Sequence, residues 1–175
     1  ELLSECVASN TACLIGTTGQ PSGFTAALAE AAVRIPVLQT ANTSMGVSLL
    51  LELTRQAARS LPGFDIEIVE AHHRHKEDAP SGTALALGRA AADGRDAAFD
   101  QLRGRARDGL APRRPDEIGF AVVRGGDIVG DHDVIFAGAG ERVVLRHQAT
   151  DRAIFARGAL RAASWLAGQP AGQYS

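Results

Sequence analysis

One short segment concentrates side chains that could carry out acid–base chemistry. It spans residues 70–84 and reads EAHHRHKEDAPSGTA. Four protonatable groups fall within five positions of it: His72, His73, His75 and Lys76. Such a cluster favours a proton donor that works near neutral pH. Two other interpretations stay open. Neutral imidazoles bind zinc, although no cysteine or spaced carboxylate completes a ligand pattern here, and a solvated basic turn needs no ligand.

The second half of the segment predicts a helix start that binds an anion. Asp78 or Ser81 can cap the helix, and Pro80 fits its first turn because proline lacks the N–H that would be unpaired there. The amides of Gly82 and Thr83 would then lie at the positive end of the helix dipole. A capped helix with nothing bound is the alternative. The cationic cluster directly before the helix favours one pocket for a small, multiply anionic substrate.

The first elements that must position this segment alternate between strands and helices. Apolar runs at 12–15 and 35–38 predict buried strands, and the alanine-rich stretch 24–32 between them predicts a helix. Strand, helix and strand at this spacing form a βαβ unit of a parallel sheet. Apolar residues at steps of three and four then predict a long helix over 44–61.

The segment itself joins a strand to a helix. Apolar and polar residues alternate over 64–71, with Phe64, Ile66 and Ile68 on one side, which predicts a half-buried strand. A helix is predicted over 81–92, and a long polar loop over 93–117.

Three strand-like runs then follow with no helix between them: 118–124, 132–137 and 142–149. They predict a largely antiparallel or mixed sheet of four strands. A last helix is predicted over 152–166, before a Gly/Pro/Gln-containing tail in which no element is expected.

Composition excludes several classes of protein. The 175 residues are 45% hydrophobic and 22% charged, which is typical of a globular protein. The net charge of −2 and the lack of aromatic residues between the arginines of 103–114 argue against nucleic-acid binding. No apolar run is long enough to span a bilayer. The two cysteines, Cys6 and Cys13, suit a reducing cytoplasm and match no metal motif.

The pattern His-His-x-x-Lys-x-Asp-Ala-Pro-Ser-Gly-Thr-Ala at 72–84 resembles the signature of the dihydrodipicolinate reductase family. Other segments resemble that family in the same order, and the likeness runs from about Leu14 to Leu166. They are Ile15–Gly19, Ala41–Asn42, Ser44, Gly46–Val47, Ile118–Phe120, Arg124, Gly126–Gly130, His132, Gly140–Arg142 and His147–Arg152.

The resemblance implies an α/β plus α+β architecture in three parts. Residues 1–43 would be the C-terminal part of a Rossmann-type dinucleotide-binding domain. Residues 44–151 would form a substrate-binding and oligomerisation domain with the four-stranded mixed sheet. Residues 152–175 would return as a helix to the dinucleotide-binding domain.

The resemblance also implies roles for individual residues. His72 and Lys76 would be the catalytic acid–base residues, with Lys76 the better proton donor because its ammonium group carries the proton. His73 would contact one carboxylate of the substrate. Gly82 and Thr83 would hold the other carboxylate, in agreement with the anion site predicted from the helix start.

The implied cofactor is NADPH or NADH. Residues after the first two strands would line the nicotinamide: Gly16, Thr17, Thr18, Thr40, Ala41, Asn42 and Thr43. The Gly-x-Gly-x-x-Gly fingerprint that grips the pyrophosphate is absent, and residue 1 is Glu rather than Met. We therefore expect an N-terminally truncated chain that is inactive as a fragment.

The function implied is the NAD(P)H-dependent reduction of a cyclic imine dicarboxylate, 4-hydroxy-tetrahydrodipicolinate (dihydrodipicolinate), in lysine and diaminopimelate biosynthesis, by a cytoplasmic homotetramer. No metal, nucleic acid or membrane is expected as a partner. The alternative is a catalytically silent dicarboxylate-binding or assembly module that has shed its cofactor site. A dehydrogenase acting on another amino-acid-derived imine is a third hypothesis.

Overall fold

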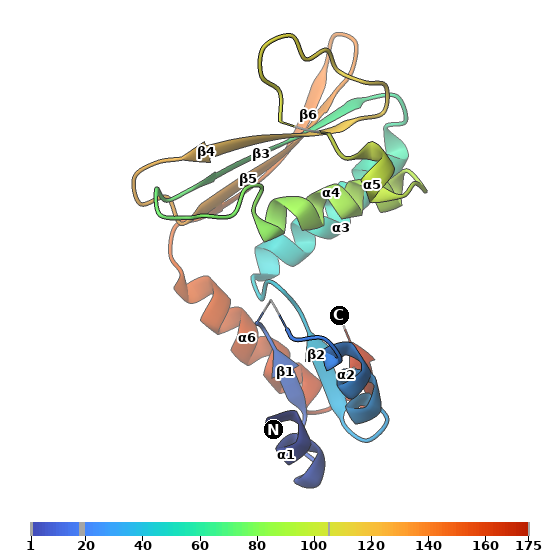
Figure 1. The fold of residues 1–175 in the computed structure, drawn as a ribbon, viewed down its shortest axis with the longest axis vertical. Helices are drawn as coiled ribbons and strands as arrows, with labels where there is room; N and C mark the ends of the chain where they lie inside the picture. Colours follow the sequence, from blue (N-terminus) through green and yellow to red (C-terminus); the bar gives the residue numbers. More distant parts are fainter. Residues whose placement is uncertain (1, 18–19, 105, 175) are drawn as a thin grey trace. The chain divides into compact units, whose positions relative to one another are not determined.

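The computed structural model describes residues 2–17, 20–104 and 106–174, and the chain divides into two units (Figure 1). The first unit combines the residues up to Met45 with those from Ala153 onward. The second runs from Gly46 to Arg152.

The first unit is a small parallel α/β layer. Its three strands pair in the order β1-β2-β7, and both pairings are parallel. The elements are α1 (Leu2–Ala8), β1 (Cys13–Ile15), α2 (Phe24–Ala32), β2 (Pro36–Gln39), α6 (Ala153–Leu166) and β7 (Gly172–Tyr174). Leu28, Ile35 and Val37 are fully buried in its core. The predicted βαβ unit is confirmed.

Strand β7 was not expected, because Gly, Pro and Gln rank low in strand propensity. Its three residues pair with Pro36, Val37 and Leu38 of β2. Pairing through the backbone places few demands on side chains, so a short edge strand leaves little signal in the sequence.

Helix α6 packs very closely on the chain that leads out of β2. A Cβ atom added to Gly158 would lie 1.8 Å from the Thr43 carbonyl oxygen, so only glycine fits. The Thr43 hydroxyl also donates to the Phe155 carbonyl oxygen at 2.7 Å. Residues far apart in sequence are thereby fixed to each other inside this unit.

The second unit is built on a four-stranded mixed sheet with the order β4-β3-β5-β6. Strand β3 pairs in parallel with β4 and antiparallel with β5, which pairs antiparallel with β6. The elements are α3 (Met45–Ser60), β3 (Asp65–His72), α4 (Gly82–Gly94), α5 (Phe99–Leu102), β4 (Ile118–Arg124), β5 (Gly130–Ala137) and β6 (Arg142–Ala149). The predicted mixed sheet is confirmed.

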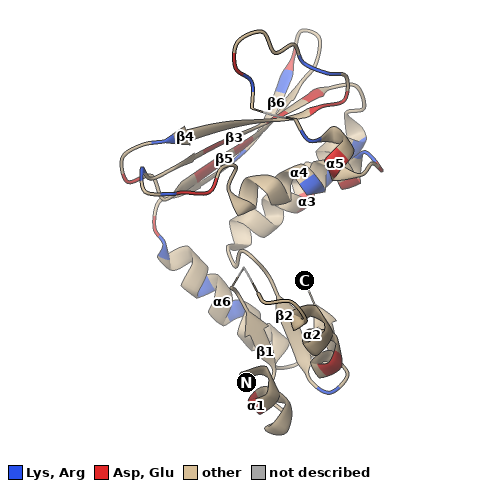
Figure 2. Ribbon diagram, in the orientation of Figure 1, with Lys and Arg blue, Asp and Glu red and all other residues tan. Residues whose placement is uncertain are grey.

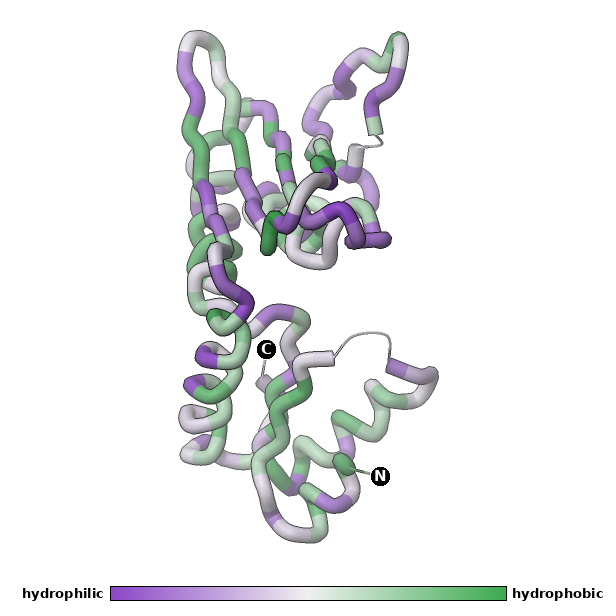
Figure 3. The backbone as a smooth tube through the Cα atoms, turned by 90° about the vertical axis from the view of Figure 1, so that its left-hand side faces the viewer, coloured by the Kyte–Doolittle hydropathy of each residue, from purple (hydrophilic) through white to green (hydrophobic). Residues whose placement is uncertain are grey.

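Helices α3 and α4 cover one face of this sheet (Figure 1). Ile66 and Ile68 of β3 and Val134 and Phe136 of β5 point into that layer and are almost completely inaccessible to solvent. Each such burial contributes roughly 1.5–3 kcal/mol relative to an exposed side chain. Hydrophobic and hydrophilic residues alternate along the strands (Figure 3), as expected for a sheet with one covered face.

The predicted loop over 93–117 contains one short helix, α5, and a bridge from Arg103 to Ile118. Arg107, Arg113 and Arg114 of this loop are held by carboxylates. Arg107 contacts Glu67 at 2.8 Å and Glu117 at 2.7 Å, and Arg113 bonds to Glu67 as well. Glu117 is only 6% exposed. These ion pairs attach the loop to β3 and to the residue that precedes β4.

Candidate active site

The segment 70–84, which carries the candidate acid–base residues, begins where β3 ends and finishes in the first turn of α4. Its backbone is tied to the turn between β4 and β5, since the amide of Gly125 donates to the His72 carbonyl oxygen at 3.0 Å and that of Arg74 to Gly126 at 3.3 Å. Three strands and a helix start thus contribute to one group of side chains.

A buried carboxylate lies at the centre of this group. Glu70 is 1% exposed on the helix-covered side of β3. Arg124, near the end of the neighbouring β4, donates to both of its oxygens at 2.8 Å. Nδ1 of His72 lies 2.5 Å from Oε2, and the Ser81 amide donates to Oε1 at 2.9 Å. Figure 2 shows acidic residues on β3 and a basic residue near the end of β4.

These contacts keep the Glu70 carboxylate ionised. Burial by itself would raise the pKa of Glu70, but the hydrogen bonds from Arg124, His72 and the Ser81 amide outweigh burial and lower it. The same pair raises the pKa of Arg124, chiefly through its hydrogen bonds to Glu70. Two-pronged, charge-assisted pairing of this kind fixes orientation as well as charge.

A second buried group, His132 of β5, supports the start of α4. It is 4% exposed, and its Nε2 lies 3.1 Å from the Ser81 hydroxyl. Burial, followed by repulsion from His72, lowers the pKa of His132 to about 4, so the ring is neutral near pH 7. The Ser81 hydroxyl also accepts from the Ala84 amide at 3.2 Å and caps α4.

Of the two capping residues that the sequence allows, Ser81 is the one that caps α4. One detail of the predicted helix start was wrong, because Pro80 precedes the cap instead of standing in the first turn. The amide of Ser81 is drawn to Glu70, which leaves Gly82 and Thr83 as the first helical residues. Gly82 is exposed, and nothing described lies within 4 Å of the position of a Cβ there. The predicted anion site is therefore open to a ligand on the Gly82 side.

Lys76 is partly buried, with 21% of its side chain exposed. Its Nζ donates to Oδ1 of Asp78 at 2.6 Å, and this contact lowers the pKa of Asp78. Arg124 donates to the carbonyl oxygen of the same aspartate at 2.8 Å. The rings of His73 and His75 lie 6.3 Å apart. The histidines thus do not form one compact cluster: His72 turns toward Glu70, away from its neighbours in sequence.

The residues predicted to line the nicotinamide belong to the first unit. Because β1 and β2 are parallel, Gly16 and the 40–43 turn follow the carboxyl ends of neighbouring strands, where nucleotides bind in such sheets. The Thr40 amide donates to the Ile15 carbonyl oxygen at 3.0 Å, so the two turns adjoin. No described atom lies within 4 Å of a Cβ built on Gly16. Thr18 lies outside the described residues.

The 40–44 turn is held by its own side chains. The Thr40 hydroxyl donates to the Asn42 carbonyl oxygen at 2.9 Å, and Asn42 Oδ1 accepts from the Ser44 amide at 2.8 Å. The Thr43 hydroxyl is used on α6, as described above. Ala41 and Thr17 are exposed. A nicotinamide ring at this edge would therefore contact backbone groups and Gly16 more than side chains.

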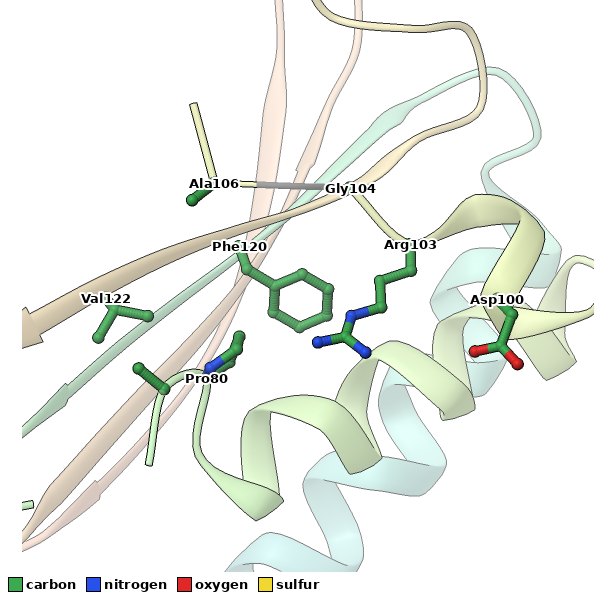
Figure 4. A pocket seen from close by; sticks show the side chains of 8 residues that line it. Pro80, Asp100, Arg103, Gly104, Ala106, Phe120 and Val122 are labelled. Atoms are coloured by element: carbon green, nitrogen blue, oxygen red, sulfur yellow. The ribbon is translucent and has the colours of Figure 1, made fainter. Parts of the chain in front are cut away.

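A separate cavity of about 660 Å³ adjoins the segment on its other side (Figure 4). Pro80, Phe120, Val122 and Arg103 line it, and the described lining includes none of the acid–base residues. It shares with the candidate site only the turn at residues 79–80. The predicted acid–base residues therefore lie outside the described lining of this cavity.

In the described part of the chain, no group of three or more His, Cys, Asp or Glu side chains could hold a metal ion. No helix among the described residues has the length and apolar character needed to cross a membrane.

Comparison with known proteins agrees with the resemblance. A family model described as dihydrodipicolinate reductase, C-terminus, matches residues 46–175. Curated 4-hydroxy-tetrahydrodipicolinate reductases from Ruegeria sp. and Thiobacillus denitrificans are 56% and 53% identical over 92% and 98% of this chain. The matched regions are 61% and 65% of those relatives, so the chain spans less than two thirds of their length.

A solved structure shows the same likeness. The dipicolinate-bound dihydrodipicolinate reductase from Paenisporosarcina sp. TG-14 superposes with a TM-score of 0.78 at 25% identity. The match covers 98% of this chain and 65% of that one. By its match over most of its length, the chain belongs to the dihydrodipicolinate reductase family.

Proposed function

We propose that the whole protein containing this chain is an NAD(P)H-dependent reductase of 4-hydroxy-tetrahydrodipicolinate. One observation carries the proposal: Glu70 and Arg124 connect the turn that bears Lys76 to the start of α4. Arg124 donates to the Asp78 carbonyl oxygen, and Glu70 accepts from the Ser81 amide. One side supplies protons and positive charge, and the other supplies backbone amides. A ring with two carboxylates matches that combination, and a relative in the same family is known in a dipicolinate-bound form.

Substrate binding rests on the helix start. The amides of Gly82 and Thr83, with the Thr83 hydroxyl, would hold one carboxylate at the positive end of α4. His73 would contact the second carboxylate. Ser81 caps the helix through its hydroxyl and donates its own amide to Glu70, so the ligand would bind at the residues that follow the cap.

Proton delivery would come from Lys76. Its Nζ carries the proton and also stabilises negative charge that develops on the ring. In the structure this ammonium group pairs with Asp78, whose side chain is 60% exposed. Such a surface pair contributes little stability, so an incoming carboxylate can compete for the ammonium group. His72, held by Glu70, is the second acid–base group and belongs to the same segment.

The cofactor would be held at the carboxyl edge of β1 and β2. When bound, NADPH or NADH supplies the hydride that the imine accepts. Gly16, Thr17 and the backbone from Thr40 to Thr43 would line a nicotinamide ring, because they follow the carboxyl ends of neighbouring parallel strands. Thr18, which lies outside the described residues, would join them. The chain has no pyrophosphate fingerprint. We therefore expect cofactor affinity, and hence activity, to require a nucleotide-binding segment beyond this chain.

The remaining parts of the proposal concern setting and assembly. Residues 1–43 and 152–175 would belong to the nucleotide-binding domain and 44–151 to the substrate domain. Val123 and Val144, on the sheet face away from α3 and α4, are each 49% exposed. That face would be covered in a homotetramer. A role in lysine and diaminopimelate biosynthesis in the cytoplasm stays a prediction.

The test is a reductase assay on this chain fused to the part of the Ruegeria relative that it does not match. The fusion should oxidise NADPH or NADH only when the substrate is present. Lys76→Ala should lower kcat at least ~100-fold, the scale of general acid catalysis. Arg74→Ala, which removes a cation from an exposed position of the same segment, is the matched control and should stay near wild type.

Two outcomes would contradict the proposal. Near-wild-type turnover of Lys76→Ala would remove this lysine from the mechanism. A folded fusion that binds dipicolinate but does not oxidise either nucleotide would favour the catalytically silent module.

A further inference from the structure

Glu70 has a position that folding alone does not explain. It continues the row of Ile66 and Ile68 on the covered face of β3, where an apolar residue would pack without the cost of burying a charge. The charge is retained, and four donors surround it. A group that is costly to bury and fully engaged calls for a role other than packing.

The geometry around Glu70 determines which nitrogen of His72 carries a proton. Each carboxylate oxygen takes one bond from the Arg124 fork and one more: Oε2 from His72 Nδ1, Oε1 from the Ser81 amide. An ionised carboxylate only accepts hydrogen bonds. Nδ1 must therefore be the donor, which leaves Nε2 at the far side of the ring for chemistry.

Nε2 of His72 faces β5 at a glycine. A Cβ built on Gly130 would lie 3.0 Å from this nitrogen, closer than side chains normally approach. A residue without a side chain at this position lets the imidazole ring lie this close to β5.

The same carboxylate connects both halves of the segment. Through the Ser81 amide it holds the residue that caps α4, and through Arg124 it holds the carbonyl oxygen of Asp78, the residue paired with Lys76. One buried group therefore sets the orientation of the imidazole, the position of the ammonium-bearing turn and the start of the helix.

We propose that Glu70 is a positioning residue. Anchored by Arg124, it holds His72 in the Nδ1–H form with Nε2 free, and it fixes this ring relative to the anion-binding start of α4. The consequence for turnover rests on the proposed reductase function. The tautomer of His72 and its coupling to anion binding do not depend on that function.

The first test leaves Glu70 and Arg124 unchanged. Long-range ¹H–¹⁵N correlation spectra of this chain, with ¹⁵N-labelled histidine, report which ring nitrogen of His72 is protonated. At a pH where the ring is neutral, Nδ1 should carry the hydrogen and Nε2 should not; a His72→Gln variant assigns the signal. A protonated Nε2, or a mixture of both forms, would overturn the proposal.

The second test separates positioning from stability. In Glu70→Leu/Arg124→Leu both charges are replaced together, an exchange that commonly preserves or raises stability. The fold should persist by circular dichroism, while His72 loses its single tautomer and dipicolinate affinity falls at least ~10-fold, within the range of supporting contacts around a binding group. Glu67→Gln, on the opposite face of β3, is the control and should change neither.

In the fusion protein, the double variant should also lower kcat at least ~10-fold, because an orienting carboxylate acts on the imidazole during the reaction. A purely structural Glu70 predicts instead that the folded double variant keeps its tautomer, its affinity and its turnover. An inactive wild-type fusion would refute the reductase proposal, whereas the tautomer and dipicolinate results would still decide the role of Glu70.

Discussion

Acidification should destabilise the second unit through His132. This imidazole is 4% exposed and touches the Ser81 hydroxyl, with the charged or titratable groups of Glu70, His72, Asp131 and His147 acting on it. Burial is the largest cause that lowers its pKa, to about 4 from an ordinary value of 6.5. The folded protein therefore resists protonation of a ring that the unfolded chain protonates readily.

The sign and size of the effect follow from linkage. Below pH 6.5 His132 becomes protonated in the unfolded state, whereas in the folded state it stays neutral until about pH 4. The free energy of unfolding therefore falls as the pH drops through that window. Above the window both states are neutral, and His132 adds no pH dependence. One pKa unit corresponds to about 1.4 kcal/mol, so the whole window is worth about 3 kcal/mol.

Urea unfolding followed by far-ultraviolet circular dichroism measures this directly. Between pH 7 and pH 4.5 the wild type should lose about 2 kcal/mol more unfolding free energy than His132→Gln. The glutamine amide keeps a partner for Ser81 and does not titrate. Glu70, whose lowered pKa acts at lower pH and in the same direction, is present in both proteins. Equal pH dependence in the two proteins would refute the reasoning.

Three further substitutions follow from the contacts. Ser81→Ala should lower the free energy of unfolding in urea by about 2 kcal/mol or more, because it removes a helix cap and the hydrogen-bond partner of a buried imidazole. Ser81→Thr should retain most of that free energy. Equal stability of the two variants would contradict the capping geometry. Gly158→Ala should lower the melting temperature, since its Cβ would lie 1.8 Å from the Thr43 carbonyl oxygen; an unchanged melting temperature would show that α6 does not pack there. Asp78→Asn should tighten dipicolinate binding up to ~5-fold by freeing Lys76, the scale of an exposed ion pair, and weaker binding in calorimetry would argue against that competition.

The sequence predicted the sheet of the second unit well because its strands alternate clearly. The same alternation also indicates on which face of β3 Glu70 lies. Once Ile66 and Ile68 define the covered face of β3, Glu70 must lie on that face, and a buried carboxylate requires partners. Its two-residue spacing from His72 then indicates a contact on the same side of the strand.

Other parts of the site depend on long-range contacts that local patterns do not carry. Ser81 meets His132 across 51 positions, and Arg124 meets Glu70 across 54. Those two contacts depend on which strands become neighbours in the sheet. Short-range crowding suggested that the histidines act together, but strand geometry sends His72 inward and leaves His75 exposed.

A dicarboxylate should bind where the Lys76 segment meets the start of α4. Titration of the ¹⁵N-labelled chain with dipicolinate, followed by amide chemical shifts, tests it most directly. The largest shifts should fall on Gly82 and Thr83 and on residues 73–76. Shifts centred instead on the Phe120 cavity, or none up to millimolar dipicolinate, would contradict the claim.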